Sequence, residues 1–96
     1  MIAVISHKEK MRVVFILGRD SNKVYCLASE RIPEGIADNL SKILYSVEDL
    51  GNRIEILKQK FAPIYKTALR VFNSKDIRIV ETYERTWKSS GWLWLG

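Results

Sequence analysis

The residues best suited to chemistry are basic ones that follow one another without an intervening acid. Residues 57–75 contain five basic residues and no Asp or Glu, whereas residues 34–56 contain five acids against two bases. Bases near a helix C-terminus complement the helix dipole, but that effect explains only one or two of them. A basic stripe can neutralise phosphate groups. We therefore predict nucleic-acid contact, with DNA or RNA, through these residues and two flanking ones: Lys58, Lys60, Lys66, Arg70, Lys75 and Arg78.

Aromatic residues are the second group, because all three tryptophans lie within the last ten residues. In an extended segment, Trp92 and Trp94 point to one side while Leu93 and Leu95 point to the other, so the two pairs cannot pack on the same helix. We predict that Trp92 and Trp94 form an interface with a partner or stack on unpaired bases. Trp87 is expected in the core.

Residues typical of enzyme sites are few. His7 is the only histidine and is expected in a solvated turn among lysines, and the only cysteine, Cys26, lies in an apolar run where cysteine is usually buried. No spacing is typical of a metal centre or a phosphate-binding loop. We predict no enzyme activity, no metal and no cofactor. Asp20, Glu81 and Glu84 are candidate ligands of a divalent ion, which keeps a small metal-dependent nuclease as a third hypothesis.

A stripe of apolar residues at helical spacing must position these groups. Its eleven members recur at alternating intervals of four and three: Ile36, Leu40, Ile43, Val47, Leu50, Ile54, Leu57, Phe61, Ile64, Ala68 and Val71. The stripe predicts a helical region that begins at Pro33 and ends at Asn73. Gly51 and Pro63 interrupt it without changing its phase, so we expect one long kinked helix or two collinear helices.

The stripe has two possible partners, its own sheet or a second copy of the helix in a coiled coil. Further apolar residues widen the surface beyond the narrow seam of a coiled coil: Leu44, Ile56, Leu69 and Phe72. In a parallel dimer, Arg53 would also face Lys58 of the other copy, which is a like-charge pair. We therefore favour packing on the sheet, with the dimeric coiled coil as the alternative.

The segments on either side of the helical region read as strands. Residues 2–5, 12–17 and 23–29 are expected to form an antiparallel meander, and residues 77–87 and 92–95 two further strands. The predicted fold is therefore α+β in the order β-β-β-α(α)-β-β, with about five antiparallel strands in one domain, residues 1–96. The helices are expected on one face of the sheet. Antiparallel sheets often leave their other face open, and function could lie there.

Composition limits the function classes. The 96 residues carry a net charge of +5 and are 47% hydrophobic, which is typical of a small basic globular domain. No signal peptide or membrane-spanning run is present, so we expect a cytoplasmic protein, and the low amide content is typical of thermophiles. The leading hypothesis is a non-enzymatic binding or assembly module that self-associates as a dimer and contacts nucleic acid through its basic segment. The alternative is a protein-interaction subunit of a larger complex that uses its Trp-rich C-terminus.

Overall fold

Three consecutive antiparallel strands open the chain: β1 (Ile2–His7), β2 (Lys10–Asp20) and β3 (Lys23–Ala28). Two later strands, β4 (Leu69–Asn73) and β5 (Ile77–Tyr83), join the two ends of this meander. The strand order is β4-β3-β2-β1-β5, and every neighbouring pair is antiparallel. The computed structural model describes residues 2–83, with the side chain of Tyr83 left out. The predicted α+β class and antiparallel meander are confirmed within this range.

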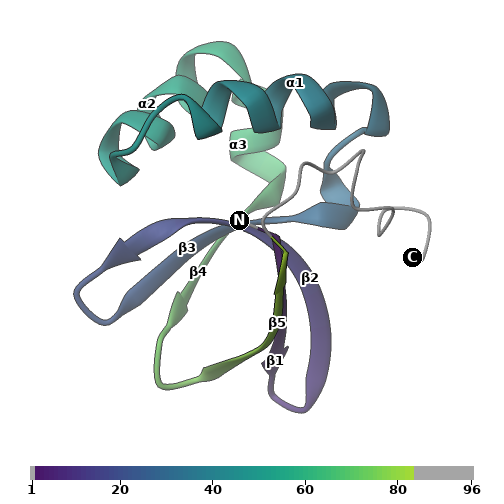
Figure 1. The fold of residues 1–96 in the computed structure, drawn as a ribbon, viewed down its shortest axis with the longest axis vertical. Coiled ribbons are helices and arrows are strands. Elements are labelled where there is room, and N and C mark those ends of the chain that lie inside the picture. Colours follow the sequence, from purple (N-terminus) through teal and green to yellow (C-terminus); the bar gives the residue numbers. More distant parts are fainter. Residues whose placement is uncertain (1, 84–96) are drawn as a thin grey trace.

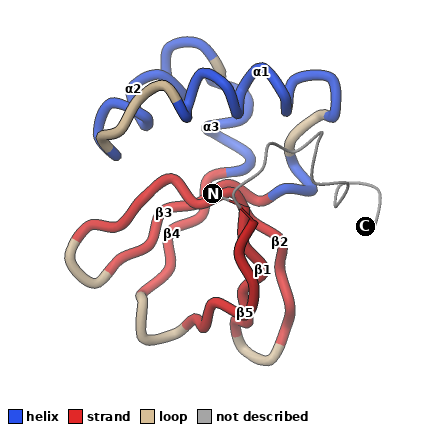
Figure 2. The backbone as a smooth tube through the Cα atoms, in the orientation of Figure 1, coloured by secondary structure: helices blue, strands red, loops and turns tan. Residues whose placement is uncertain are grey.

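The helical region consists of a 3-10 turn, η1 (Ser29–Arg31), followed by α1 (Glu34–Tyr45), α2 (Leu50–Lys60) and α3 (Ala62–Ala68). These three α-helices run in different directions above the sheet (Figures 1 and 2), so the predicted single kinked helix or collinear pair is wrong. Asp49 begins α2, because its carboxylate accepts a 3.1 Å hydrogen bond from the backbone N–H of Asn52. Pro63 lies in the first turn of α3, where its missing N–H costs nothing.

The helical region also ends earlier than predicted, at Ala68 and not at Asn73. Residues 69–73 form β4, which pairs with β3 from Leu27↔Leu69 to Lys23↔Asn73. The segment Leu-Arg-Val-Phe alternates polar and apolar residues only weakly, but its β-branched and aromatic members suit a strand once β3 offers its edge. Val71 is 46% exposed, so its place in the apolar stripe did not reflect burial.

The apolar stripe packs on its own sheet, as predicted. One buried cluster joins the face of the sheet that the helices cover, here called the outer face, to the helices themselves. Its largest members are Ile2, Phe15, Leu17 and Leu27 from the strands and Leu40, Leu44 and Leu57 from the helices. Helix α2 packs closely on β2 at Gly18, where an added Cβ would lie 3.2 Å from Cβ of Leu50.

The opposite face of the sheet, here called the inner face, is concave and buries a set of its own side chains. Strand β2 pairs with β1 along its first half and with β3 along its second, and it bends between the two (Figure 1). A β-bulge between Ile16 and Gly18 assists the bend. A second cluster of buried residues lies on the inner face: Ala3, Ile5, Val14, Ile16, Val24 and Cys26. The centre of this face is therefore closed, and the expectation of an open second face is wrong there.

The short turn between β4 and β5 joins the two ends of the sheet. In this turn, the backbone N–H of Asp76 donates to the carbonyl of Asn73 at 2.9 Å, and Ser74 donates to the carbonyl of Asn22 at 2.7 Å. The rings of His7 on β1 and Phe72 on β4 pack with their centroids 4.8 Å apart. These contacts bring the outermost strands near one another without hydrogen-bonded pairing between them, so the sheet forms a partly open barrel (Figure 2).

Candidate nucleic-acid interface

The three predicted lysines of the helical layer are exposed but do not behave alike. Lys58 on α2 lies 3.8 Å from the Glu55 carboxylate and 5.5 Å from the centre of the Tyr65 ring, so part of its charge is engaged locally. Lys60 is the last residue of α2, and Lys66 lies in the last turn of α3. Neither forms an ion pair with a carboxylate of residues 2–83. Lys60 and Lys66 are therefore available to a phosphate group.

Arg70 does not share a helical face with Lys66, because α3 ends at Ala68 and Arg70 lies on β4. Its Nη1 donates hydrogen bonds to the carbonyl oxygens of Thr67, at 3.0 Å, and Leu69, at 2.9 Å. Arg70 is opposite Cys26 in the β3–β4 pair, and opposite residues of an antiparallel pair share a face. Arg70 is therefore on the inner face of the sheet, and the residue is half-buried there.

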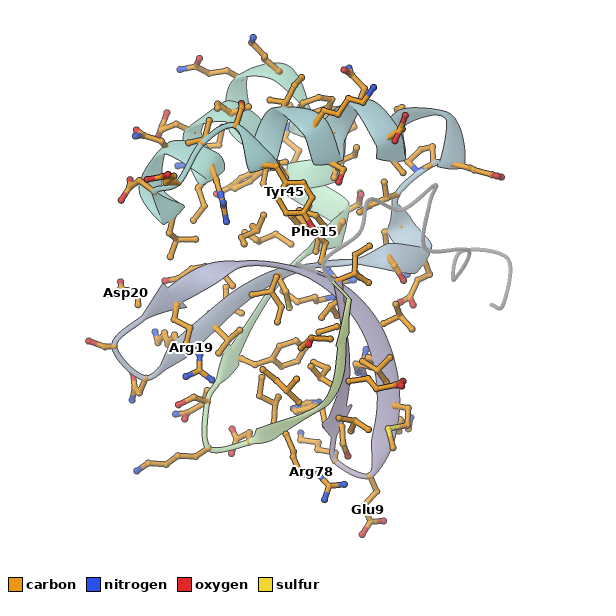
Figure 3. All side chains as sticks on the ribbon, viewed as in Figure 1. Glu9, Phe15, Arg19, Asp20, Tyr45 and Arg78 are labelled. Atoms are coloured by element: carbon orange, nitrogen blue, oxygen red, sulfur yellow. The ribbon has the colours of Figure 1, made fainter. Side chains whose placement is uncertain are left out.

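The two flanking residues lie elsewhere. Lys75 is exposed in the β4–β5 turn, where its backbone N–H donates to Oδ1 of Asn73 at 3.0 Å. Arg78 is exposed on β5, opposite Ser6 and one position away from Ile77 and Ile79, which places it on the outer face. Figure 3 shows Arg78 at the end of the sheet farthest from the helices. The six predicted residues thus divide between the helices, the turn and both faces of the sheet.

The inner face carries further basic residues that the sequence did not single out. Strand pairing places Lys10 opposite His7, Arg12 opposite Ile5 and Arg19 opposite Val24. All the basic groups of this face are His7, Lys10, Arg12, Arg19 and Arg70. No described strand position on the inner face holds Asp or Glu, since Asp20 and Glu81 pair on the outer face. Figure 3 shows Arg19 on the side of β2 that faces away from the helices.

Two arginines of this face lie near the buried thiol of Cys26. Burial raises the pKa of Cys26 to about 12, while the positive charges of Arg70 and Arg12 act in the opposite direction and lower it. Cys26 has no exposed surface, and its Sγ lies 3.7 Å from the carbonyl oxygen of Arg70 as a weak donor. The predicted burial of Cys26 is confirmed. Both guanidinium groups therefore act on one buried atom in the middle of the inner face.

His7 lies in a different environment from the solvated turn predicted for it. It is the last residue of β1, and it is half-buried against Phe72. Its Nδ1 is enclosed and has no hydrogen-bond partner among the described residues. The turn was predicted to include His7 because Lys8 and Lys10 follow it closely, but β1 extends through His7. Its side chain therefore helps to close the barrel.

The structure says less about the predicted metal-ion ligands and the predicted tryptophan interface. Within residues 2–83, no group of three His, Cys, Asp or Glu side chains is arranged to hold a metal ion. Glu84 and the tryptophans Trp87, Trp92 and Trp94 lie outside the described residues. No described helix has the length and apolar character that crossing a bilayer requires.

Comparison with family models, with curated proteins and with solved structures finds no match to this chain. The functional argument therefore rests on the geometry above. Its central feature is the position of Arg70, where the acid-free segment, residues 57–75, meets the acid-free inner face of the sheet.

Proposed function

We propose that this chain is a small non-enzymatic binding module that contacts nucleic acid. One observation supports it most directly: Arg70 belongs both to the acid-free segment, residues 57–75, and to the inner face. Neither the segment nor the described strand positions of the inner face contain an acidic residue. Clustered cations without neighbouring carboxylates create a positive potential that attracts a polyanion and releases its counterions. Lys60, Lys66 and Arg70 are proposed as phosphate contacts, with Lys58, Lys75 and Arg78 contributing from their margins.

The test is a titration of the full chain with single-stranded and double-stranded oligonucleotides, followed by the fluorescence of its three tryptophans at several salt concentrations. We expect saturable binding whose affinity falls steeply with salt. Exchanging Lys60 and Lys66 together for Gln should weaken binding. It should also lower the slope of log affinity against log salt concentration by the amount expected for about two phosphate contacts. The matched control exchanges Lys23 and Lys42 for Gln, which removes the same charge from exposed positions outside both sets.

If both double variants lose affinity equally, net charge and not this surface accounts for binding. If the folded wild-type protein shows no salt-dependent binding to either oligonucleotide form, the proposed function is wrong. The salt slope is the decisive quantity because it counts phosphate contacts, whereas affinity alone also includes stacking and apolar contacts.

A second function, self-association or assembly with another protein, is supported by a separate observation. Strands β4 and β5 each have one edge without a strand partner in residues 2–83, and each carries exposed apolar side chains: Val71 on β4 and Ile79 and Val80 on β5. An unpaired edge bearing apolar residues favours pairing with another chain. The predicted interface residues Trp92 and Trp94 lie outside the described range, so these edges are an additional proposed contact surface.

A further inference from the structure

Strand β4 turns alternate backbone groups toward its free edge, which has no strand partner in residues 2–83. In the turn after β4, the N–H of Ser74 donates to the carbonyl of Asn22 at 2.7 Å, and these two residues continue the β3–β4 register. Opposite residues of an antiparallel pair alternate between those that exchange hydrogen bonds and those that do not. Phe72 and Arg70 therefore bond to β3. Three residues have backbone N–H and C=O groups that point to the free edge: Leu69, Val71 and Asn73.

Two of these three outward carbonyls already accept a hydrogen bond from this chain. The carbonyl of Leu69 accepts from Nη1 of Arg70 at 2.9 Å, and that of Asn73 accepts from the N–H of Asp76, also at 2.9 Å. The edge therefore offers the N–H groups of Val71 and Asn73 but only one open carbonyl, that of Val71. An edge with more open donors than open acceptors favours a ligand rich in acceptor oxygens.

The charges along this edge are predominantly positive. Nη1 of Arg70 donates to an outward carbonyl, so this guanidinium group lies at the edge itself. Exposed Lys66 lies in the last turn of α3, just before the edge, and exposed Lys75 lies in the turn just after it. Every charged residue of the segment 57–75 is basic, and the first acid after it is Asp76. An acidic segment laid along β4 would therefore meet cations at its middle and near both of its ends.

The side chains of β4 set the pattern of the ligand. Val71, which is 46% exposed, lies on the outer face, and Arg70 lies on the inner face. A strand added to this edge alternates its own side chains between the same two faces. It would place an apolar side chain beside Val71 and a carboxylate beside Arg70. The matching ligand is therefore an extended segment in which acidic and apolar residues alternate.

We propose that the free edge of β4 binds an extended acidic segment of another protein, which adds to the sheet as a further antiparallel strand. Main-chain hydrogen bonds give strand addition its affinity, and the alternating side chains give it specificity. The inference rests on the second function proposed above, assembly with another protein, and it names the surface and the chemistry of that partner. A second copy of β4 matches the edge less well, because it would bring the same cations to both sides of the new pair.

The probe is a short capped peptide of alternating Glu and Val, and its controls replace every Glu by Gln or by Lys. Hydrogen exchange of backbone amides in the full chain, measured by NMR, follows binding. In the free protein, the amide of Val71 should exchange faster than that of Phe72, which bonds to β3. The Glu peptide should slow exchange at Val71 severalfold, the Gln peptide less and the Lys peptide least, and added salt should reduce these differences. Equal effects of the three peptides, or none, would overturn the inference.

The variant arm uses Val71→Pro, which removes an outward N–H without removing a bond to β3, a position where edge strands tolerate proline. We expect the Glu peptide to bind it about tenfold more weakly. Val71→Ala is the matched control, because it keeps the N–H and loses only side-chain contact, so its loss should be smaller. Equal binding by Val71→Pro and the wild type would contradict pairing along this edge.

Methylated peptides keep the test decisive if Val71→Pro does not fold. In an antiparallel pair, the Val opposite Val71 donates its N–H to the Val71 carbonyl. A peptide methylated on its Val nitrogens should therefore lose binding to the wild type, whereas methylation on its Glu nitrogens, which face away from β4, should leave binding intact. The reverse order, or equal binding of both peptides, would contradict the proposed pairing.

The other occupants of this edge are separate outcomes of the same measurement. If no peptide protects Val71 but the chain self-associates in a way that Val80→Lys disrupts, assembly stands through β5 and the inference falls. If Val71 becomes protected as the concentration of the chain rises without peptide, the occupant is a second copy and the acidic segment is overturned. If oligonucleotides protect Val71 and the peptide does not, the edge binds nucleic acid and the inference is also overturned.

Discussion

Nη1 of Arg53 on α2 donates a 2.8 Å hydrogen bond to the carbonyl oxygen of Leu17 in β2. Leu17 is the residue that the β-bulge leaves without a partner in the register of β2 and β3, where Ile16 pairs with Cys26 and Gly18 with Tyr25. Nε of the same guanidinium donates to the carbonyl of Val47, in the loop before α2, at 2.6 Å. Arg53 thus satisfies a carbonyl that the sheet cannot and ties α2 to it.

Arg53→Met should lower the free energy of unfolding by about 3 kcal/mol, because two charge-assisted hydrogen bonds disappear and the Leu17 carbonyl loses its partner. Urea unfolding followed by far-UV circular dichroism measures the change. Lys58→Met on the same helix is the control, and it should cost under about 0.5 kcal/mol because its ion pair with Glu55 is exposed. Equal effects of the two substitutions would contradict this role of Arg53.

Gly18→Ala should destabilise the protein by about 1–3 kcal/mol, because the added methyl would lie 3.2 Å from Cβ and 3.3 Å from Cδ1 of Leu50. Gly35→Ala in the first turn of α1 is the matched control. Nothing lies within 4 Å of a Cβ added at Gly35, and alanine favours the helix, so a gain of about 0.5 kcal/mol is expected. Thermal unfolding of both variants separates the steric effect of the contact with Leu50 from the general effect of exchanging glycine for alanine. A neutral result at Gly18 would mean that α2 moves away from β2 freely.

Cys26 should make stability depend on pH in the alkaline range. Its thiol pKa is about 12 in the folded protein against 9.0 when unperturbed, so the folded state favours the neutral thiol. This contribution is complete below pH 9.0 and is lost as pH rises toward 12. Urea unfolding should therefore show that the stability of the wild type relative to Cys26→Ala falls as pH rises above 9.0. Other groups titrate in both proteins and cancel, so a constant difference would refute the prediction.

The free edges of β4 and β5 should carry any self-association of the described domain. Val71→Lys and Val80→Lys each replace an exposed apolar side chain on an edge, where each residue is 46% and 44% exposed respectively. Each change should weaken association about tenfold, which is the loss expected from leaving one valine unburied. Ile36→Lys on α1, 37% exposed, is the control and should have no effect. Sedimentation equilibrium measures the outcome, and an equal effect of all three would exclude the edges.

Much of the fold follows from local sequence. The first three strands are readable because β-branched runs alternate with polar turns, and the apolar stripe correctly predicts a helical layer on one face. The breaks between the helices are not readable from the stripe, because Asp49 and Pro63 change the direction of the chain without changing the apolar phase. Strand β4 was missed because its structure depends on the β3 edge, a tertiary partner that sequence spacing does not reveal.

The residues of the candidate site also fall into those that the sequence reveals and those that only the strand pairing reveals. The run of bases in residues 57–75 is visible in the sequence, and so is the exposure of Lys60 and Lys66. The inner-face arginines are not, because only the strand pairing places Arg12 and Arg70 on the same face of the sheet. One signal was present. Lys10, Arg12, Val14 and Ile16 alternate at the period of a strand, which places two cations on the same side as the buried valine and isoleucine.

The last pairing of the sheet sets the order in which this chain can fold. Strand β5 pairs with β1 from His7↔Ile77 to Ile2↔Tyr83, so the contact joins the two ends of the described chain. Pairings of such sequence separation form late, since loop-closure entropy must be overcome before they contribute. During synthesis, β2 and β3 can collapse onto the first helices while β1 keeps one edge exposed. Late closure of the barrel is therefore the stage at which a nascent chain is most open to pairing with a neighbour.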